Sequence, residues 1–202
     1  MKTGINMGEH YFTRDPGAEH EEKEILFSCR GKKCVCVTDS GVFSRDGLDE
    51  GTRLLLESLP KLSGRVLDLG CGWGPVGLIL GRCFPDIEIV MTDINERAVD
   101  LANRNLRKND VTNAYAVQGD ITENVAGPFD AVILNPPIRT GKENVYKMYD
   151  ESHACLKDGG ALYIVIRKQQ GAESTAKHLK TVFLEVERIE RDKGYWVLRC
   201  MK

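Results

Sequence analysis

The sequence predicts an α/β fold in which a doubly wound, mostly parallel sheet of seven strands is covered by helices on both faces. Two patterns carry this prediction: strand-like and helix-like segments alternate along the chain, and the strand-like segments are nearly continuous apolar runs. The last two strand-like segments are joined only by residues 192–194, a connection that permits only an antiparallel pair. We therefore expect one reversed strand, supplied by a C-terminal hairpin.

The composition is that of a globular protein and excludes several other classes. The chain has 202 residues, of which 42% are hydrophobic and 29% charged, so it is long enough for one domain with a sizeable core. No apolar run approaches the ~20 residues of a membrane span, and the first residues carry no signal-peptide pattern. We expect a cytoplasmic protein that does not contact a membrane.

Charge and cysteine usage limit the partners. A net charge of −2 is unlike that of a general polyanion binder, so contact with nucleic acid requires a local basic patch or a preorganised partner. Seven cysteines without a Cys-x-x-Cys pair favour reduced thiols and no metal site. Cys34 and Cys36 are two residues apart, which on a strand places both thiols on one face.

The chain is expected to form a single globular unit from two parts, an N-terminal extension over residues 1–48 and a core over residues 49–202. In the extension, residues 25–29 and 33–38 are short β-like runs with turn residues between them. They predict a small antiparallel element packed against the core.

In the core, helices are predicted where apolar residues recur three and four positions apart, and strands where apolar runs are continuous. Helices are expected over 51–59, 75–84, 95–108, 144–156 and 172–183. Strands are expected over 65–69, 87–91, 114–117, 131–134, 161–166, 184–191 and 195–201. Pro60 ends the first helix, Pro75 suits the first turn of the second, and Asp158-Gly159-Gly160 is expected to stop the fourth.

The loop after the first core strand is rich in glycine. In sheets of this kind a ligand binds at the carboxyl ends of the strands, near the point where the strand order reverses. The loop reads Asp68-Leu-Gly70-Cys71-Gly72-Trp-Gly74 and precedes a helix, so its backbone can approach a ligand closely. Asp68 would repel a pyrophosphate but would suit a cationic ligand or an amino group. Trp73 either shields the ligand or fills the core.

The next two strands also end at carboxylates. Asp93 is placed to accept hydrogen bonds from ribose hydroxyls, and Ile94 to pack on an adenine ring. Alternatively, Asp93 only caps the following helix. Asp120 could accept from the adenine amino group, or it is only a turn residue.

After the fourth strand comes Asn135-Pro136-Pro137, the most informative stretch of the sequence. Two prolines cannot continue a strand ladder, and they hold the backbone rigidly. They fix the Pro136 carbonyl beside the Asn135 side chain, so that two acceptors converge on one point. A planar NH2 group has two donors at about that geometry.

These motifs resemble those of the class I S-adenosylmethionine-dependent methyltransferases. Asp68-x-Gly-x-Gly-x-Gly is similar to their first motif, Asp93 to their ribose-binding acid, and Asn135-Pro-Pro-Ile to the motif of members that methylate amino or amide nitrogens. The similarity is closer to the small-methyltransferase domain of ribosomal RNA guanine-N2 methyltransferases and runs from about residue 10 to the end. The segments that carry it are His10-Tyr11-Phe12, Gly41-Val42-Phe43-Ser44, Leu48-Asp49-Glu50-Gly51-Thr52 and Asn135-Pro-Pro-Ile-Arg-Thr-Gly-Lys142.

The resemblance implies a Rossmann-like enzyme that uses S-adenosylmethionine to methylate the exocyclic N2 amino group of a guanine in ribosomal RNA or a ribosomal particle. It implies that Asn135, Pro136 and Pro137 form the catalytic motif. The residues expected to bind the cofactor are Asp68, Gly70, Cys71, Gly72, Gly74, Asp93, Ile94, Asp120, Asn135 and Thr52, with Asp49 nearby. Those expected to bind the substrate are Ile138, Arg139 and Lys142, with Arg167 and Lys168 on the same face, unless these charges are ordinary surface residues.

Some features depart from the family pattern. Bacterial relatives typically carry a second, N-terminal methyltransferase-like domain that helps to bind RNA; this sequence does not show it, and a homodimer could replace it. Ile138 stands where many relatives have an aromatic residue that stacks on the target base. His10 and Tyr11 are expected to close over the cofactor, whereas His153 is expected to be a partly buried helix residue.

Other interpretations remain open. The Asn-Pro-Pro motif also serves the methylation of glutamine side chains in release factors and of adenine N6, although those groups usually have an aromatic residue after the prolines. The string Gly72-x-Gly74-x-x-Gly77 fits an NAD-binding oxidoreductase but leaves Asn135 without a role. A non-catalytic RNA-binding protein with this fold is the remaining alternative. A Cys71 nucleophile is disfavoured, because a small residue in the loop explains it.

Overall fold

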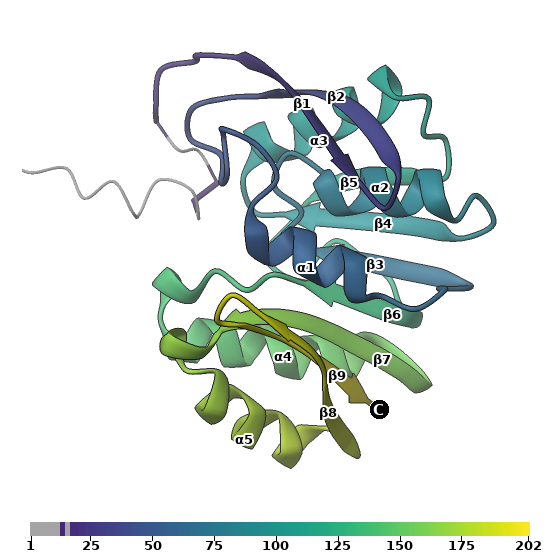
Figure 1. The fold of residues 1–202 in the computed structure, drawn as a ribbon, viewed down its shortest axis with the longest axis vertical. Helices are drawn as coiled ribbons and strands as arrows, with labels where there is room; N and C mark the ends of the chain where they lie inside the picture. The colour runs from purple at the N-terminus through teal and green to yellow at the C-terminus, as the bar shows by residue number, and fades with distance from the viewer. Residues whose placement is uncertain (1–12, 15–16) are drawn as a thin grey trace, which may run out of the picture.

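The structure is a computed structural model that describes residues 13–14 and 17–202 (Figure 1). Its strands are β1 (Lys23–Cys29), β2 (Lys32–Thr38), β3 (Arg65–Leu69), β4 (Glu88–Asp93), β5 (Ala114–Gln118), β6 (Phe129–Leu134), β7 (Leu156–Arg167), β8 (Glu185–Asp192) and β9 (Tyr195–Met201). Its helices are α1 (Glu50–Ser58), α2 (Pro75–Cys83), α3 (Glu96–Lys108), α4 (Lys142–Cys155) and α5 (Ala172–Val182), with short 3-10 turns η2 (Ile138–Thr140) and η3 (Lys168–Gln170).

The main sheet has seven strands in the order β5-β4-β3-β6-β7-β9-β8. Strands β3 to β7 are mutually parallel, and β9 runs antiparallel between β7 and β8. The predicted fold class, including the single reversed strand from the C-terminal hairpin, is confirmed. A separate two-stranded sheet pairs β1 with β2, as expected for the extension.

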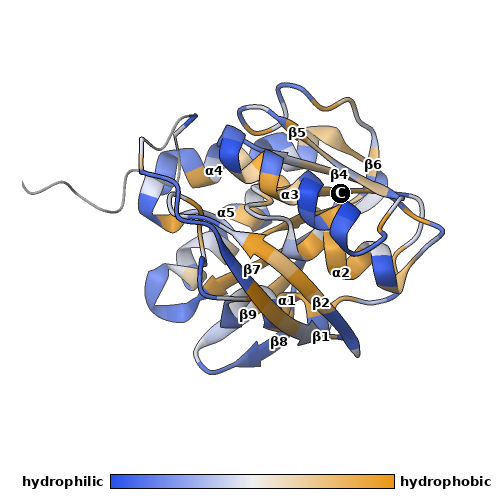
Figure 2. Ribbon diagram, turned by 90° about the horizontal axis from the view of Figure 1, so that it is seen from above, coloured by the Kyte–Doolittle hydropathy of each residue, from blue (hydrophilic) through white to orange (hydrophobic). Residues whose placement is uncertain are grey.

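Helices cover both faces of the sheet because the buried strands are apolar on both sides. Along β3, Val66 packs into a core under α1, α2 and α3, whereas its neighbour Leu67 packs into a second core under α4 and α5. The hydropathy colouring follows this arrangement, with hydrophobic residues along the sheet and α2 and mostly hydrophilic loops (Figure 2). Asp68 shares the face of Val66, which places a carboxylate beneath α2.

The start of β7 differs from the prediction. The sequence Asp158-Gly159-Gly160 was expected to follow α4 as its stop, but the helix ends at Cys155 and these residues lie inside β7. They form a bulge between two pairs in register, Phe129 with Leu156 and Ala131 with Ala161. The buried Leu156 therefore joins the strand, and Gly159 accommodates the bulge with a φ of +75°.

One asparagine on α3, Asn105, and the C-cap residue of that helix, Asn109, hold the β1–β2 hairpin against the core. The buried Asn105 accepts from the Val37 backbone N–H at 2.7 Å and donates to the Val37 and Trp73 carbonyls, both at 2.9 Å. One turn later, Asn109 pairs with Val35 in the same way, at 3.1 and 2.8 Å. The two amides act as a short partner strand for the free edge of β2. The division of the chain at residues 48 and 49 stays a prediction.

Some global features of the described residues bear on the class of protein. None of their helices is long and apolar enough to cross a membrane. All seven cysteines are free thiols, and Cys34 and Cys36 are both buried on one face of β2.

Replacing Asn105 tests how the hairpin is held. Asn105→Ala removes the partner of the partly buried Val37 N–H and of the Val37 and Trp73 carbonyls, so we expect the free energy of unfolding to fall by about 3 kcal/mol. The measurement is urea denaturation with its midpoint and slope. Arg107→Ala, at an exposed position on the same helix, is the control and should change stability by less than about 0.5 kcal/mol. Equal effects of the two substitutions would contradict the role of Asn105.

Candidate active site

A cavity of about 760 Å³ opens at the carboxyl ends of the parallel strands, where the strand order reverses between β3 and β6. This is the position at which the sequence placed a ligand site. Its lining includes most of the residues singled out from the sequence, namely Thr52, Asp68, Gly70, Cys71, Gly72, Asp93, Ile94, Asp120, Asn135, Pro136, Pro137, Ile138 and Arg139. Gly74 and Lys142 are not among the lining residues.

The glycine loop exposes its backbone to the cavity. The N–H groups of Gly70 and Cys71 both donate to the Thr92 carbonyl, at 2.8 and 2.9 Å, and so tie the loop to the end of β4. Gly70 and Gly72 have φ angles of +73° and +54°, which favour glycine. A Cβ at Gly72 would meet no atom within 4 Å, so the space beside this residue is open.

Gly74 contributes by packing rather than by lining the cavity. It precedes α2 with a φ of +91°, and a Cβ there would lie 3.0 Å from the Ala102 Cβ and 3.1 Å from the Met91 Cε. The glycine therefore allows the start of α2 to approach α3 and β4 closely.

Asp68 is the most unusual group in the cavity wall. It is only 3% exposed, and its Oδ2 atom has no hydrogen-bond partner. Burial, and more weakly the charge of Asp93, raise the pKa of Asp68 to about 7, although the Gly77 N–H acts in the opposite direction. An unpartnered carboxylate oxygen at this depth is suited to a ligand that brings a positive charge or a donor.

Asp93 is held by backbone groups from two loops. Its Oδ2 accepts from the Gly72 N–H at 2.8 Å, and its Oδ1 accepts from the Asn95 N–H at 3.0 Å. The cap of α3 is Asn95, which accepts from the Arg97 and Ala98 N–H groups, so helix capping does not explain Asp93. Burial raises the pKa of Asp93, and hydrogen bonds from the Asn95, Gly72 and Ile94 backbone N–H groups oppose that shift.

Ile94 and Asp120 also line the cavity, near Asp93. Ile94 is half-buried and lies between the carboxylate of Asp93 and the start of α3. Asp120 is exposed and forms an ion pair with Lys147 on α4, with 3.5 Å between Nζ and Oδ2. The pair joins the two sides of the strand-order reversal at the rim.

The Asn135 amide is oriented by the first turn of α1. Its Nδ2 donates to the Thr52 Oγ1 at 3.0 Å and lies 3.5 Å from the Asp49 Oδ1. Asp49 is the N-cap of α1, and the same Oδ1 accepts from the Gly51 and Thr52 N–H groups. Because a carboxylate only accepts, the NH2 side of the amide must face α1. The Asn135 Oδ1 has no partner among the described residues.

The two prolines behave partly as expected. Pro137 has φ −76° and ψ 77°, an inverse γ-turn in which the Pro136 carbonyl accepts from the Ile138 N–H at 2.9 Å. One lone pair of that carbonyl is therefore used inside the loop, and the second is available. Pro136 is buried, which fixes this carbonyl next to Asn135.

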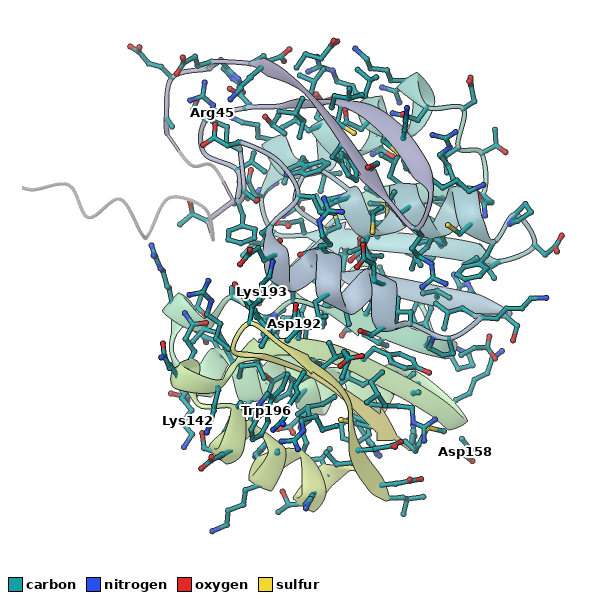
Figure 3. The ribbon with its side chains drawn as sticks, in the orientation of Figure 1. Arg45, Lys142, Asp158, Asp192, Lys193 and Trp196 are labelled. Atoms are coloured by element: carbon teal, nitrogen blue, oxygen red, sulfur yellow. The ribbon has the colours of Figure 1, made fainter. Side chains whose placement is uncertain are left out.

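The basic residues lie at different distances from the cavity. Arg139 lines its rim and is exposed, and Arg167 lines it with its guanidinium 4.7 Å from the centre of the Tyr195 ring. Lys142 points elsewhere, with Nζ 5.2 Å from the centre of the Tyr146 ring on the surface of α4. Figure 3 shows Lys142 on the side of the molecule opposite Asp158.

The cavity is also lined by four residues that were not predicted to belong to the site, namely Val42, Phe43, Ser44 and Tyr195. The first three follow the β1–β2 hairpin, far from the strand ends in sequence. Gly41-Val42-Phe43-Ser44 resembles a family signature, and that resemblance is the one signal in the sequence that links these residues to the site.

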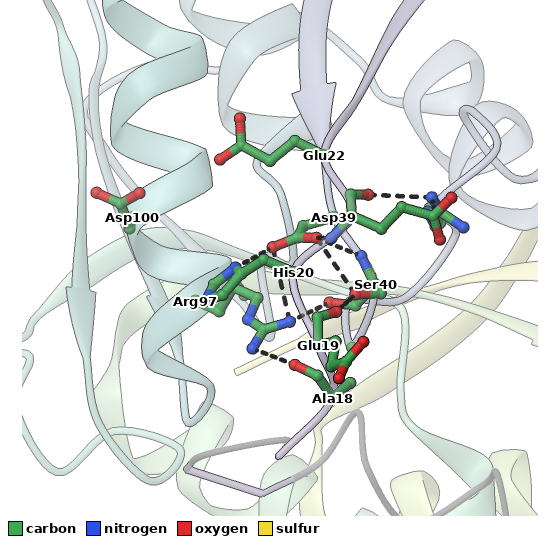
Figure 4. A network of polar contacts seen from close by, with 12 residues as sticks. Ala18, Glu19, His20, Glu22, Asp39, Ser40, Arg97 and Asp100 are labelled. Carbon is green, nitrogen blue, oxygen red and sulfur yellow. Dashed lines mark hydrogen bonds and ion pairs between the residues drawn. The ribbon is translucent and has the colours of Figure 1, made fainter.

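The loop that carries Phe43 is fixed by a polar network (Figure 4). Arg97 donates to the Ser40 carbonyl at 2.7 Å and lies 3.6 Å from the buried Asp39 carboxylate. Asn95 donates to the Gly41 carbonyl at 2.8 Å, and His20 contacts Asp39 at 2.6 Å. Asn95 and Arg97, which follow Asp93 in the sequence, therefore also hold the loop that carries Phe43.

Several other residues are settled by the geometry. Trp73 is 1% exposed, packs edge-on against Phe27 and donates to the Ser44 carbonyl at 3.2 Å, so it belongs chiefly to the core. Burial raises the pKa of the Cys71 thiol well above its usual value, which argues against a nucleophile. His153 packs against Phe183, away from the cavity.

The expected flap of His10 and Tyr11 lies outside the described residues. Within residues 13–14 and 17–202, no group of three or more His, Cys, Asp or Glu side chains is placed to hold a metal ion.

The chain matches one protein family, and it is similar in sequence to individual proteins. The family described as methyltransferase small domain matches residues 33–199. The uncharacterized protein YbxB of Bacillus subtilis is 42% identical over 200 residues, which cover 97% of this chain and all of YbxB.

Two further relatives carry functional names. Ribosomal RNA small subunit methyltransferase C of Shewanella loihica is 40% identical over 169 residues, which cover 81% of this chain and 48% of that protein. The solved structure of the T. thermophilus 16S rRNA N2 methyltransferase RsmC, in complex with AdoMet and guanosine, matches with a TM-score of 0.81 and 25% identity. That match covers 90% of this chain and 50% of RsmC, so the chain spans about half the length of these two relatives.

The buried Asp68 predicts a pH-dependent stability difference. Its pKa in the folded protein, about 7, lies above the ordinary 3.8, so stability is lost as pH rises between these values. Asp68→Asn, which does not ionise, should therefore gain about 3 kcal/mol relative to the parent between pH 5 and pH 8. Urea denaturation of the ligand-free protein measures this. A difference that does not change with pH would contradict the burial effect; Asp86→Asn, at an exposed site, is the control.

Proposed function

The chain belongs to the methyltransferase small domain family and is an S-adenosylmethionine-dependent methyltransferase, and we propose that it methylates the N2 amino group of a guanine in ribosomal RNA. The family resemblance, the enzyme class and the cofactor expected from the sequence are thereby confirmed. The nucleic acid, the position of the guanine and the roles of individual residues are proposals, supported by the site as follows.

The wall formed by β3 and β4 fits the cofactor. The cofactor supplies an electrophilic methyl group on a sulfonium, and the unpartnered Asp68 Oδ2 is a suitable acceptor or counter-charge for its positive parts. The open space beside Gly72, with Gly70 and Cys71, accommodates the methionine part. Each oxygen of Asp93 keeps a lone pair after its backbone contact, and these lone pairs would hold the ribose hydroxyls.

The remaining cofactor contacts come from the rim. Ile94 would pack on the adenine ring, and Asp120 would accept from the adenine amino group when it is not paired with Lys147. Gly74 acts through the packing of α2 in this proposal, and Thr52 acts through Asn135 as well as by lining the cavity.

The orientation of the Asn135 amide is the observation that supports binding of a substrate amino group. With its NH2 group fixed by Thr52 and Asp49, its oxygen is free to accept one hydrogen of a substrate amino group. The second lone pair of the Pro136 carbonyl would accept the other hydrogen, and Pro137 holds that carbonyl in place. The nitrogen lone pair is then turned out of conjugation toward the methyl group.

This arrangement catalyses by position and electrostatics. The guanine amino group is a poor nucleophile because its lone pair is delocalised into the ring. Two acceptors would stabilise the positive charge that develops on the nitrogen as the N–CH3 bond forms and the S–CH3 bond breaks to leave S-adenosylhomocysteine, and the rigid loop would hold both acceptors in place. No strong base is needed, because the methylated amino cation loses a proton readily.

The RNA is proposed to enter over the rim of the cavity. A guanine in a folded RNA must be turned out of its stack to reach Asn135, where Ile138 would pack on the base. Arg139 and Arg167 are placed to contact phosphates, with Lys142 further out on α4. We place the protein in the cytoplasm with ribosomal RNA or a ribosomal particle as partner. A homodimer would add a second RNA-binding surface.

Methyl transfer into RNA tests the proposed function. Labelled methyl groups from S-adenosylmethionine, offered with total RNA and with ribosomal subunits, should appear in N2-methylguanosine on nucleoside analysis. Asn135→Ala should lower the rate by at least about a hundredfold, since it removes one of the acceptors of the transition state. Asp86→Ala, at an exposed position outside the cavity, should keep the parental rate. Label in protein instead of RNA would indicate glutamine methylation, and label in N6-methyladenosine would indicate adenine.

Measuring the affinity for the cofactor distinguishes residues that bind S-adenosylmethionine from residues that act on the substrate. Asp93→Asn removes a charged acceptor, so we expect the Kd for S-adenosylmethionine to rise about 10- to 100-fold by calorimetry. Asn135→Ala should change that Kd less than about threefold while lowering kcat. Asp100→Asn, exposed on α3, is the control. An unchanged Kd for Asp93→Asn would remove Asp93 from the cofactor site.

A further inference from the structure

The amino groups that an Asn-Pro-Pro site can methylate differ in what stands beside them. In guanine, the N2 amino group is flanked by N1–H, a hydrogen-bond donor. In adenine the N6 amino group is flanked by N1, an acceptor, in cytosine the N4 amino group by the acceptor N3, and in a glutamine side chain by the carbonyl oxygen. A protein acceptor placed beside the site of methylation therefore selects guanine, because it would face a lone pair in the other three.

Asp49 is placed to be that acceptor. Its Oδ1 is occupied by the Gly51 and Thr52 N–H groups, at 3.0 and 3.1 Å, and lies 3.5 Å from the Asn135 Nδ2. The carboxylate lines the same cavity as Asn135 and Pro136 and is half-buried. Its Oδ2 has no hydrogen-bond partner among the described residues. The amide oxygen of Asn135 is bonded to the same carbon as Nδ2, so both side chains bring an oxygen without a partner among the described residues to the same cavity.

We propose that Asp49 is the specificity-determining residue of this site and that its Oδ2 accepts the N1–H of the target guanine. The proposal rests on the proposed function, since it names the group that chooses the base for the amino group that Asn135 holds. One carboxylate then does three things with its two oxygens: Oδ1 caps α1 and orients the Asn135 amide, and Oδ2 reads the neighbouring position of the base. A charged acceptor makes a stronger hydrogen bond than a neutral one and strongly disfavours a facing lone pair.

The helix cap makes Asp49→Asn a defined exchange of hydrogen-bonding type. The Gly51 and Thr52 N–H groups can bond only to an oxygen, so the oxygen of the new amide must take the place of Oδ1. Its NH2 group must then take the place of Oδ2. Asparagine is as good an N-cap as aspartate, so the helix and the fold should be retained. The substitution turns an acceptor that faces N1 into a donor.

The experiment compares guanine with 2-aminopurine, which keeps the N2 amino group but has a lone pair at N1. Synthetic RNAs that span the methylated guanine carry either base at that position. The parent protein should methylate guanine with a kcat/KM at least about tenfold above that of 2-aminopurine. With Asp49→Asn, the guanine value should fall at least tenfold and the preference should shrink to within about threefold or invert. Glu50→Gln removes the same charge from an exposed neighbour outside the cavity and should keep the parental preference.

Binding gives a second measurement that does not depend on turnover. The fluorescence of 2-aminopurine riboside, competed with guanosine in the presence of S-adenosylhomocysteine, reports the same preference for parent and variants. A guanine preference that survives Asp49→Asn, in either measurement, would overturn the role of Asp49 and leave the proposed function standing. A parent protein that methylates no guanine in any RNA would overturn the proposed function, and the role of Asp49 with it.

Discussion

Between β3 and β6 the main sheet reverses its direction of winding, so the chain leaves these adjacent strands toward opposite sides. From β3 it proceeds through α2 and α3, which cover one face, and from β6 through α4 and α5, which cover the other. The loops that follow the two strands therefore diverge and leave a cavity at their carboxyl ends. Asp68 is the penultimate residue of β3 and Asn135 follows β6, so the reversal brings two groups that are far apart in the sequence to one cavity.

Asparagine side chains join the parts of the molecule that the sheet does not join. An amide can donate and accept at once, so it can complete the backbone pairing of a neighbouring segment. Asn105 and Asn109 do this for the edge of β2, and Asn95 caps α3 while holding the Gly41 carbonyl. Asn135 differs from these three amides, because only its NH2 group has partners among the described residues. What sets its oxygen apart is its place in the lining of the cavity.

The fold could be predicted from the sequence because its strands are continuous apolar runs and its helices are periodic, and both patterns reflect burial. The strand ends that carry Asp93 and Asn135 follow from the same patterns. Contacts between distant segments left no local trace: Tyr195 and Phe43 reach the cavity from the C-terminal hairpin and from the loop after β2. The bulge at Asp158 was missed for a related reason, since its residues read as a turn and only the pairing of Leu156 with Phe129 makes them part of a strand.

Asp68 interrupts the apolar pattern of β3, and it does so at the cavity. Within Val66-Leu67-Asp68-Leu69 the pattern of a buried strand requires an apolar residue at position 68, yet a carboxylate with an unpartnered oxygen stands there and its pKa is raised to about 7. Such a group weakens the ligand-free fold, and the apolar packing of β3 on both faces offsets that loss. A positively charged ligand in the cavity would favour the ionised carboxylate and lower its pKa again. The free-energy cost of burying the Asp68 carboxylate therefore arises at the point where binding of a cation would reduce it. This accounts for an acidic residue within a buried strand.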